Sequence, residues 1–173
     1  MAGKIGSLHG HRPAIIKDDV ALIPIGKEAK HGYAIVDKEF AWLDKYNWTL
    51  KSGYGSNYAV RRYDHKIVKM QWYVLPRKAG FVIDHINGDK RDNRITNLRY
   101  ATHKENLRNR GAPTNNTSGY KGVSYRKDTD KYAAYIGHGK ERICLGCFLT
   151  AREASLAYNK TASQIYGEFA RLN

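Results

Sequence analysis

The stretch VIDHINGDKRDNRITNLRYATHKEN, from Val82 to Asn106, decides the expected fold and chemistry of this chain. VIDH is strand-like, INGDKRDNR has the composition of a polar turn-rich loop, and ITNLRYA returns as a second strand. Thr102 and Glu105 form a T-x-x-E capping box, which predicts that a helix starts there. The stretch is therefore expected to fold as strand, loop, strand and helix.

Three side chains of this stretch suit one reaction. Asp84 offers a carboxylate oxygen of the kind that Mg²⁺ or Mn²⁺ prefers, and Asn106 adds a second oxygen ligand on the helix. His85 offers an imidazole, whose ordinary pKa of about 6.5 allows it to take a proton from water. A hard cation beside such a base is what phosphodiester hydrolysis requires. The alternative is a structural hairpin, because Asp, Asn and Gly are common turn residues.

Composition points to a polyanionic partner. The chain has 173 residues, enough for one domain or two small ones, and a hydrophobic fraction of 42% supplies a core. Its 30 Lys and Arg against 16 Asp and Glu give a net charge of +14. Nucleic acid is the usual reason for such a surplus. A structural RNA-binding protein also explains the charge, whereas a membrane-surface protein would need a basic amphipathic helix that the sequence lacks.

The cysteines and the apolar segments indicate the compartment and further limit the class of protein. Cys144 and Cys147 form a single C-x-x-C inside the strand-like run ERICLGCFL, and no second pair completes a zinc site. We interpret them as ordinary thiols, which fits a reducing compartment. No apolar block resembles a signal peptide or is long enough to cross a bilayer. A soluble cytoplasmic protein is expected, with no membrane partner and no small-molecule substrate.

The chain divides into two predicted modules, and the fold class is α+β. Residues 1–17 have the composition of a basic arm, 18–110 form the first module, 111–117 (GAPTNNT) a linker, and 118–173 the second module. The first includes a strand at 32–37, a short helix capped by Asp37, and a hairpin whose turn is 52–56. In the second, the runs YKGVSYR, KYAAYI and ERICLGCF predict a small three-stranded antiparallel sheet. A second T-x-x-E box at Thr150 starts a helix that packs on it, and Gly167 ends that helix.

Val82 to Asn106 resembles the HNH endonuclease motif in the form found in phage and intron homing endonucleases, and AWLDKYNW and NYAVRR extend the likeness to roughly residues 20–110. The resemblance implies a ββα-metal (His-Me finger) domain that holds one Mg²⁺ or Mn²⁺ ion. It makes His85 the general base, and Asn97, twelve residues on, the residue that orients this base and braces the hairpin. Asp84 and Asn106 become the metal ligands.

Two positions depart from this motif. Asn106 stands where many relatives carry His, although some homing-type members also have Asn there. Gln71 stands where relatives often carry a His, so the role of that position is open. His103 is too close to Asn97 to replace Asn106 as ligand, and it is expected to touch the phosphate or support the site.

Residues 118–173 resemble the ethylene-response-factor (AP-two) type of DNA-binding domain through YKGVSYR, KYAAYI, LGCF, AYN and YGEFARLN. The likeness implies that the sheet lies in the major groove of duplex DNA. Strand alternation directs Ile143 and Leu145 toward the helix and Arg142 and Cys144 away from it. The candidates for DNA contact are Lys121, Arg126, Tyr135 and Arg142, with Arg108 and Arg110 as further phosphate contacts. Relatives carry more Arg and Trp on this face, so base specificity is expected to differ.

The pairing of these modules is familiar in phage-encoded homing-type nucleases. The expected function is therefore a metal-dependent endonuclease acting on double-stranded DNA as a monomer, inside the bacterial host of a phage. Whether it nicks or cuts both strands stays open, as does the target sequence. The alternative is a non-cleaving DNA-binding regulator that keeps an inactive nuclease scaffold.

Overall fold

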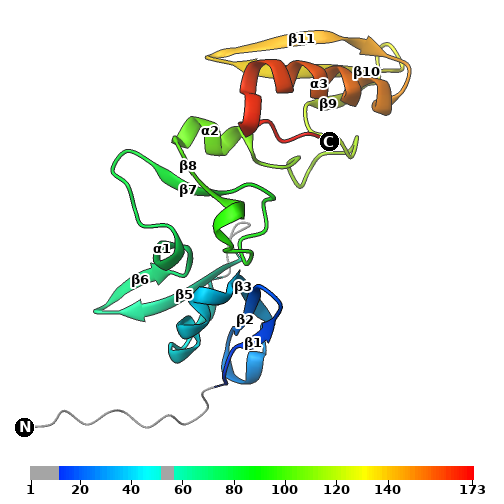
Figure 1. Cartoon of the computed structure of the whole chain (residues 1–173). Helices are drawn as coiled ribbons and strands as arrows, with labels where there is room; N and C mark the ends of the chain where they lie inside the picture. Colours follow the sequence, from blue (N-terminus) through cyan, green and yellow to red (C-terminus); the bar gives the residue numbers. More distant parts are fainter. Residues whose placement is uncertain (1–11, 52–56) are drawn as a thin grey trace, which may run out of the picture. The chain divides into compact units, whose positions relative to one another are not determined.

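The computed structural model describes residues 12–51 and 57–173, and it has the predicted α+β class, with small antiparallel sheets and few helices (Figure 1). The chain forms two compact units, Met1–Tyr100 and Ala101–Asn173. The first unit has one hydrophobic core, and the second has two smaller clusters between its sheet and its long helix. The segment proposed as a linker, residues 111–117, lies within the second unit. In the described part of the chain, no helix has the length and apolar character that crossing a membrane would need.

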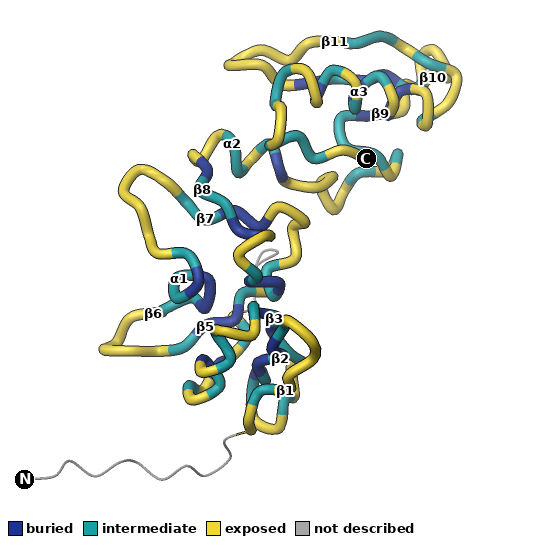
Figure 2. Tube along the Cα trace, viewed as in Figure 1, coloured by how far each residue is buried: buried dark blue, intermediate teal, exposed yellow. Residues whose placement is uncertain are grey.

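The first unit begins with a three-stranded antiparallel sheet of β1 (Ile15–Lys17), β2 (Val20–Pro24) and β3 (Tyr33–Asp37), with the short η1 (Lys27–Ala29) between the last two. Alternate residues of β2 and β3 are buried (Figure 2), which is the pattern of strands with one face on a core. The predicted strand at 32–37 is confirmed. The predicted basic arm is wrong in part, because Ile15–Lys17 pairs with β2; residues 1–11 lie outside the described residues.

The segment after β3 is helical, but Asp37 does not cap it. η2 (Lys38–Lys45) follows Asp37 directly, and no side-chain capping bond is made. The Asp37 carboxylate instead accepts a hydrogen bond of 2.7 Å from the backbone N–H of Ile95, far along the chain. The tertiary bond replaces the predicted local one, so Asp37 ties β3 to the loop that carries the motif.

A second antiparallel sheet consists of β4 (Thr49–Lys51), β5 (Tyr58–Tyr63) and β6 (Lys66–Lys69), and α1 (Gln71–Val74) follows it. Its β4–β5 pair confirms the predicted hairpin, whose turn at 52–56 lies outside the described residues. Trp48 and Met70 pack in the core of this unit, and the Trp48 indole donates a 2.7 Å hydrogen bond to the Leu43 carbonyl. Burial of these large side chains anchors the sheet beside the motif.

The motif folds as a strand pair, β7 (Val82–His85) and β8 (Leu98–Ala101), joined by a long loop that ends in η3 (Ile95–Asn97). α2 (His103–Arg108) begins in the second unit with the predicted capping box: Thr102 accepts from the Glu105 N–H, and Glu105 accepts from Thr102. The predicted order of strand, loop, strand and helix is confirmed.

The second unit contains the predicted sheet and helix: β9 (Val123–Arg126), β10 (Lys131–His138) and β11 (Glu141–Phe148), in the order β11-β10-β9, with α3 (Ala151–Tyr166) and η4 (Gly167–Phe169). The Thr150–Glu153 capping box starts α3, and Gly167 ends it with φ of 54°. Ala154, Tyr158 and Ala162 form the buried stripe of α3 against the sheet.

A β-bulge in β11 changes which residues share a face. Tyr135 pairs with Cys144 and Ala134 with Gly146, so Leu145 is the extra residue. Leu145 packs against the helix side, as predicted, and Ile143 pairs with Ile136, which is buried on that side, although Ile143 itself is 37% exposed. Arg142 and Cys144 pair with Gly137 and Tyr135, on the face away from α3, as the alternation predicts.

Candidate active site and nucleic-acid interface

His85 lies at the end of β7 and is fully buried. Its Nε2 is 3.1 Å from Oδ1 of Asn93, and its ring packs against Tyr58 with 5.9 Å between ring centroids. The Nδ2 group of Asn93 donates to the Arg91 carbonyl at 3.1 Å, so the opposite atom of this amide is the acceptor. His85 therefore carries its proton on Nε2, and Nδ1 is its basic atom.

Burial lowers the pKa of His85 to about 4. The nearby Lys90 charge lowers this pKa further, while the bond to Asn93 and the charges of Asp84 and Asp92 raise it. The imidazole is consequently neutral at pH 7, which is the form that can accept a proton.

This pKa predicts how stability depends on pH. The folded state leaves His85 neutral down to about pH 4, whereas an unfolded chain protonates it near pH 6.5. Its stabilising contribution is therefore full above pH 6.5 and is lost as the pH falls toward 4, by about 3 kcal/mol in total. Denaturant unfolding in chelator at pH 7.5, 5.5 and 4 should show this loss. A His85→Gln variant should lose less stability over the same range; parallel curves would contradict the prediction.

Asp84 is held by an arginine on the paired strand. Nε and Nη2 of Arg99 both lie 3.0 Å from Oδ2 of Asp84, and their side chains are 11% and 1% exposed. Because successive residues of a strand point to opposite faces, Asp84 and His85 diverge from the end of β7. Asp84 meets Arg99, and His85 meets Asn93 and Tyr58.

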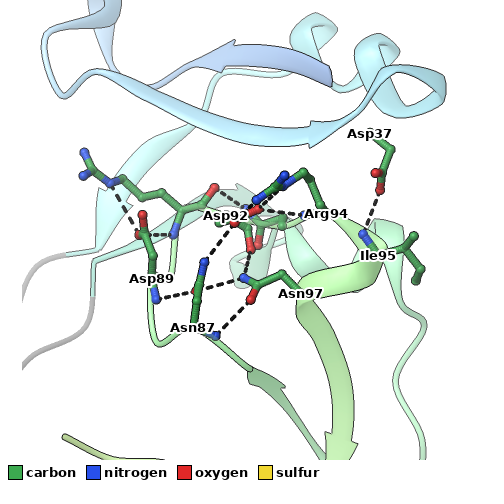
Figure 3. A network of polar contacts seen from close by, with 9 residues as sticks. Asp37, Asn87, Asp89, Asp92, Arg94, Ile95 and Asn97 are labelled. Atoms are coloured by element: carbon green, nitrogen blue, oxygen red, sulfur yellow. Dashed lines mark hydrogen bonds and ion pairs between the residues drawn. The ribbon is translucent and has the colours of Figure 1, made fainter. Parts of the chain in front are cut away.

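Asn97 braces the loop of the hairpin. Its Oδ1 accepts a 3.0 Å bond from the Asn87 N–H, and its Nδ2 donates to Asn87 Oδ1 at 3.0 Å and to the Asp92 carbonyl at 2.7 Å (Figure 3). Three bonds from one buried amide close the loop directly after His85. The side chain that contacts His85 is that of Asn93, whereas the side chain of Asn97 holds the loop.

The same loop is bound to β3 and to its own arginine. The backbone of Ile35 exchanges hydrogen bonds with Arg91 and Asn93, at 2.8 and 2.7 Å. Asp92 binds the Arg94 guanidinium through both carboxylate oxygens, at 2.8 and 2.7 Å (Figure 3), and these bonds lower the pKa of Asp92 although burial opposes them. The loop between β7 and β8 is thus held in place by its bonds to β3 and by the bonds between Asp92 and Arg94.

Asn106 and His103 belong to the second unit. Asn106 is half-buried in α2, and His103 is exposed in the first turn of that helix. Gln71, the other variant position of the motif, is buried in α1. The described residues contain no cluster of three or more His, Cys, Asp or Glu able to hold an ion. The ligand set that the motif implies is smaller, a carboxylate and an amide oxygen, and both are hard donors that suit Mg²⁺ or Mn²⁺.

Three of the predicted DNA contacts lie together on the sheet face away from α3. The Arg142 guanidinium stacks 3.9 Å from the ring centroid of Tyr135, and Arg126 donates to the Tyr135 hydroxyl at 3.4 Å. Arg126 is also paired with Asp128, at 2.6 Å. Both arginines are exposed and project on one surface of the sheet from β9 and β11, the two strands that flank β10.

The other basic candidates are placed differently. The Lys121 ammonium donates to the Arg108 carbonyl at the end of α2, and burial lowers the pKa of Lys121 to about 8, with a further contribution from Arg171. Arg108 stacks on Tyr166, 4.6 Å from the ring centroid. Arg110 is exposed. Lys121 and Arg108 therefore contribute to packing within the second unit.

Sequence reasoning missed Asn93, Arg99 and Tyr58, the residues that contact His85 and Asp84. Arg99 had a usable signal, because the predicted hairpin places a basic residue opposite an acidic one. Asn93 is indistinguishable in sequence from the other turn residues of NGDKRDNR. Tyr58 comes from a different sheet.

Comparison with known proteins agrees with both modules. The model of the HNH endonuclease family matches residues 75–108. Protein 3.8 of Escherichia phage T7 is 34% identical over 97 residues, which cover 56% of this chain and 78% of the phage protein. An uncharacterized HNH endonuclease of Acanthamoeba polyphaga mimivirus is 28% identical over 162 residues, 91% of this chain and 83% of that protein. No solved structure matches.

The C-terminal module has plant relatives. Dehydration-responsive element-binding protein 2C of Arabidopsis thaliana is 41% identical over 69 residues, 39% of this chain but only 20% of the plant protein. These matches define the class of protein: an HNH-type motif joined to a sheet-and-helix module of the DNA-binding type. The chain belongs to the HNH endonuclease family and carries a C-terminal DNA-binding domain of the ethylene-response-factor type.

Proposed function

We propose that this protein is a metal-dependent, homing-type endonuclease that hydrolyses double-stranded DNA and is targeted by its C-terminal domain. The observation that carries the proposal is His85: a neutral imidazole with a defined tautomer, at the end of a strand whose following loop is clamped by Asn97. A fixed base of this kind is what activation of water requires. The phage relative supports action inside a bacterial host.

In the proposed mechanism, Nδ1 of His85 takes the proton from the attacking water. Asn93 keeps the imidazole in the tautomer that leaves Nδ1 basic, and Asn97 keeps the loop closed. The motif spacing supports Asp84 and Asn106 as ligands of one Mg²⁺ or Mn²⁺ ion in a ββα-metal arrangement, with His103 as a supporting residue. When bound, such an ion neutralises charge that develops on the phosphate and on its leaving oxygen.

The burial of Asp84 and His85 sets a condition on this mechanism. Their side chains are 1% and 0% exposed, so a phosphate reaches them only if neighbouring side chains move. Tyr58, which packs on the His85 ring and is itself half-buried, is the described side chain best placed to do so. The proposed site therefore opens when DNA binds.

For targeting, the face formed by Arg126, Tyr135 and Arg142 is the proposed DNA contact. The guanidinium carbon of Arg142 lies 3.9 Å from the centroid of the Tyr135 ring, and a guanidinium is the group suited to bidentate contact with guanine. Lys121 is a weaker candidate than its sequence position indicates, because its ammonium already donates to a helix end. One active site per chain makes a monomer that nicks one strand the simplest form of the enzyme.

Supercoiled plasmid incubated with the protein tests this function. We expect conversion to nicked or linear DNA with Mg²⁺ or Mn²⁺ and none with chelator, with 5′-phosphate and 3′-hydroxyl ends. Because the substrate is long, the target sequence need not be known. Plasmid that is bound but stays intact with every metal would instead favour the alternative, a DNA-binding regulator with an inactive nuclease scaffold.

A further inference from the structure

Three lysines gather around Tyr58 in the first unit. Lys51 pairs with Tyr58 across β4 and β5, and Lys69 pairs with Val60, two residues further along β5. Residues paired directly across strands share a face, and so do residues two apart along one strand. Lys51, Tyr58 and Lys69 therefore lie on one face of this sheet. Lys90 joins them from the motif loop.

Two of these ammonium groups make cation–π contacts with the Tyr58 ring. Nζ of Lys69 lies 3.9 Å from the ring centroid and Nζ of Lys90 lies 5.8 Å from it, both within the range of cation–π attraction. The same ring packs on His85. One aromatic side chain thus connects the proposed general base to a cluster of positive charge.

The cluster is held together against its own repulsion. Burial is the largest cause that lowers the pKa of Lys69, and the charges of Lys51 and Lys90 lower it further. The Lys90 charge also acts on His85. The carboxylates nearest to His85 are bound by arginines, Asp84 by Arg99 and Asp92 by Arg94. An anion that binds among the lysines would relieve this repulsion.

We propose that Lys51, Lys69 and Lys90, arranged around Tyr58, form the binding site for a DNA backbone phosphate that neighbours the phosphate cleaved at His85. This inference rests on the proposed nuclease function. Lysine is suited to such a contact, because its ammonium binds phosphate as a compact charge without reading the base sequence. The site fixes the register of the strand relative to His85 and displaces the lysines from the Tyr58 ring.

The test compares binding and cleavage by the full-length protein. Charge is removed from the cluster by Lys69→Gln, by Lys90→Gln and by the double variant. The conservative variant Lys69→Arg keeps the charge. The matched control is Lys30→Gln, which removes an exposed charge between β2 and β3. Affinity for a short duplex is measured in chelator over a range of KCl concentrations, and plasmid cleavage is measured with Mg²⁺. Thermal unfolding checks that each variant is folded.

We expect Lys69→Gln and Lys90→Gln each to reduce the slope of log affinity against log salt by about 1, and the double variant to reduce it by about 2. KM should rise roughly tenfold with kcat largely kept, because the lysines act on binding and because His85, whose pKa is about 4, stays neutral at pH 7 without the Lys90 charge. Lys69→Arg should stay near wild type, and so should Lys30→Gln. If the cluster variants match Lys30→Gln in salt slope and KM, the phosphate site is wrong while the nuclease function stands.

The experiment distinguishes a failure of the proposed nuclease function from a failure of the proposed phosphate site. A wild-type protein that cuts no plasmid, but whose salt slope falls in the lysine variants, would remove the nuclease function and leave a DNA-backbone site. If Lys69→Gln unfolds, Lys90→Gln decides alone, since Lys90 lies in the loop and outside the sheet.

Discussion

Replacing His85 by alanine is expected to lower kcat for plasmid cleavage by about 10²–10⁴-fold, the usual contribution of a positioned general base. The neutral imidazole, with its proton fixed on Nε2 by Asn93, is the group that accepts the proton of the attacking water in the proposed mechanism. Alanine offers no acceptor. Affinity for duplex DNA in chelator should stay near wild type, since the lysine cluster and the sheet of the second unit keep their charges. Single-turnover cleavage rates and binding isotherms measure the two effects.

Two controls separate chemistry from packing. His138→Ala removes an exposed imidazole from β10 and should leave the cleavage rate unchanged. Because His85 is buried, its alanine variant leaves a cavity, and thermal unfolding establishes whether the variant is folded. Free imidazole added to a folded His85→Ala protein should restore part of the rate, which a purely structural histidine would not allow. Unchanged kcat in the variant would remove His85 as the base.

Local signals in the sequence predicted much of the fold. Both capping boxes, at Thr102 and Thr150, form as expected, because each depends on residues only three apart. The hairpin of β4 and β5 could equally be predicted, because alternating apolar and polar residues and a Gly-rich turn define it. Strand β1 was missed, because three residues between charged and turn-forming neighbours carry too little pattern.

Only part of the candidate site could be predicted from the sequence. The resemblance to the nuclease motif predicted Asp84, His85 and Asn97 as site residues, and these three lie within one hairpin. The partners that set their chemistry come from tertiary structure: Tyr58 arrives from another sheet, and burial depresses the His85 pKa. In the second unit, the bulge at Leu145 shifts the register by one residue. Simple alternation cannot detect such an insertion.

Replacing Arg99 by glutamine is expected to lower the free energy of unfolding in chelator by about 3 kcal/mol or more. The substitution leaves the carboxylate of Asp84, 1% exposed, without the guanidinium that now lies 3.0 Å away, and breaking a buried pair in this way costs about that much. The matched control is Arg94→Gln. Arg94 binds Asp92 with similar geometry but is 41% exposed, so solvent screens the loss and a smaller effect is expected. Denaturant unfolding at neutral pH measures both variants.

The double variant Asp84→Asn, Arg99→Gln should recover much of the lost stability, because it removes the buried carboxylate charge together with the guanidinium that binds it. Metal adds an independent readout. If Asp84 is a ligand of the proposed ion, Mg²⁺ or Mn²⁺ should raise the melting temperature of Arg99→Gln more than that of wild type, since the ion replaces the missing counter-charge and stabilises the folded state by mass action. The double variant should show no such rise. Equal responses of all three proteins would separate Asp84 from the metal and leave its bond to Arg99 as a structural one.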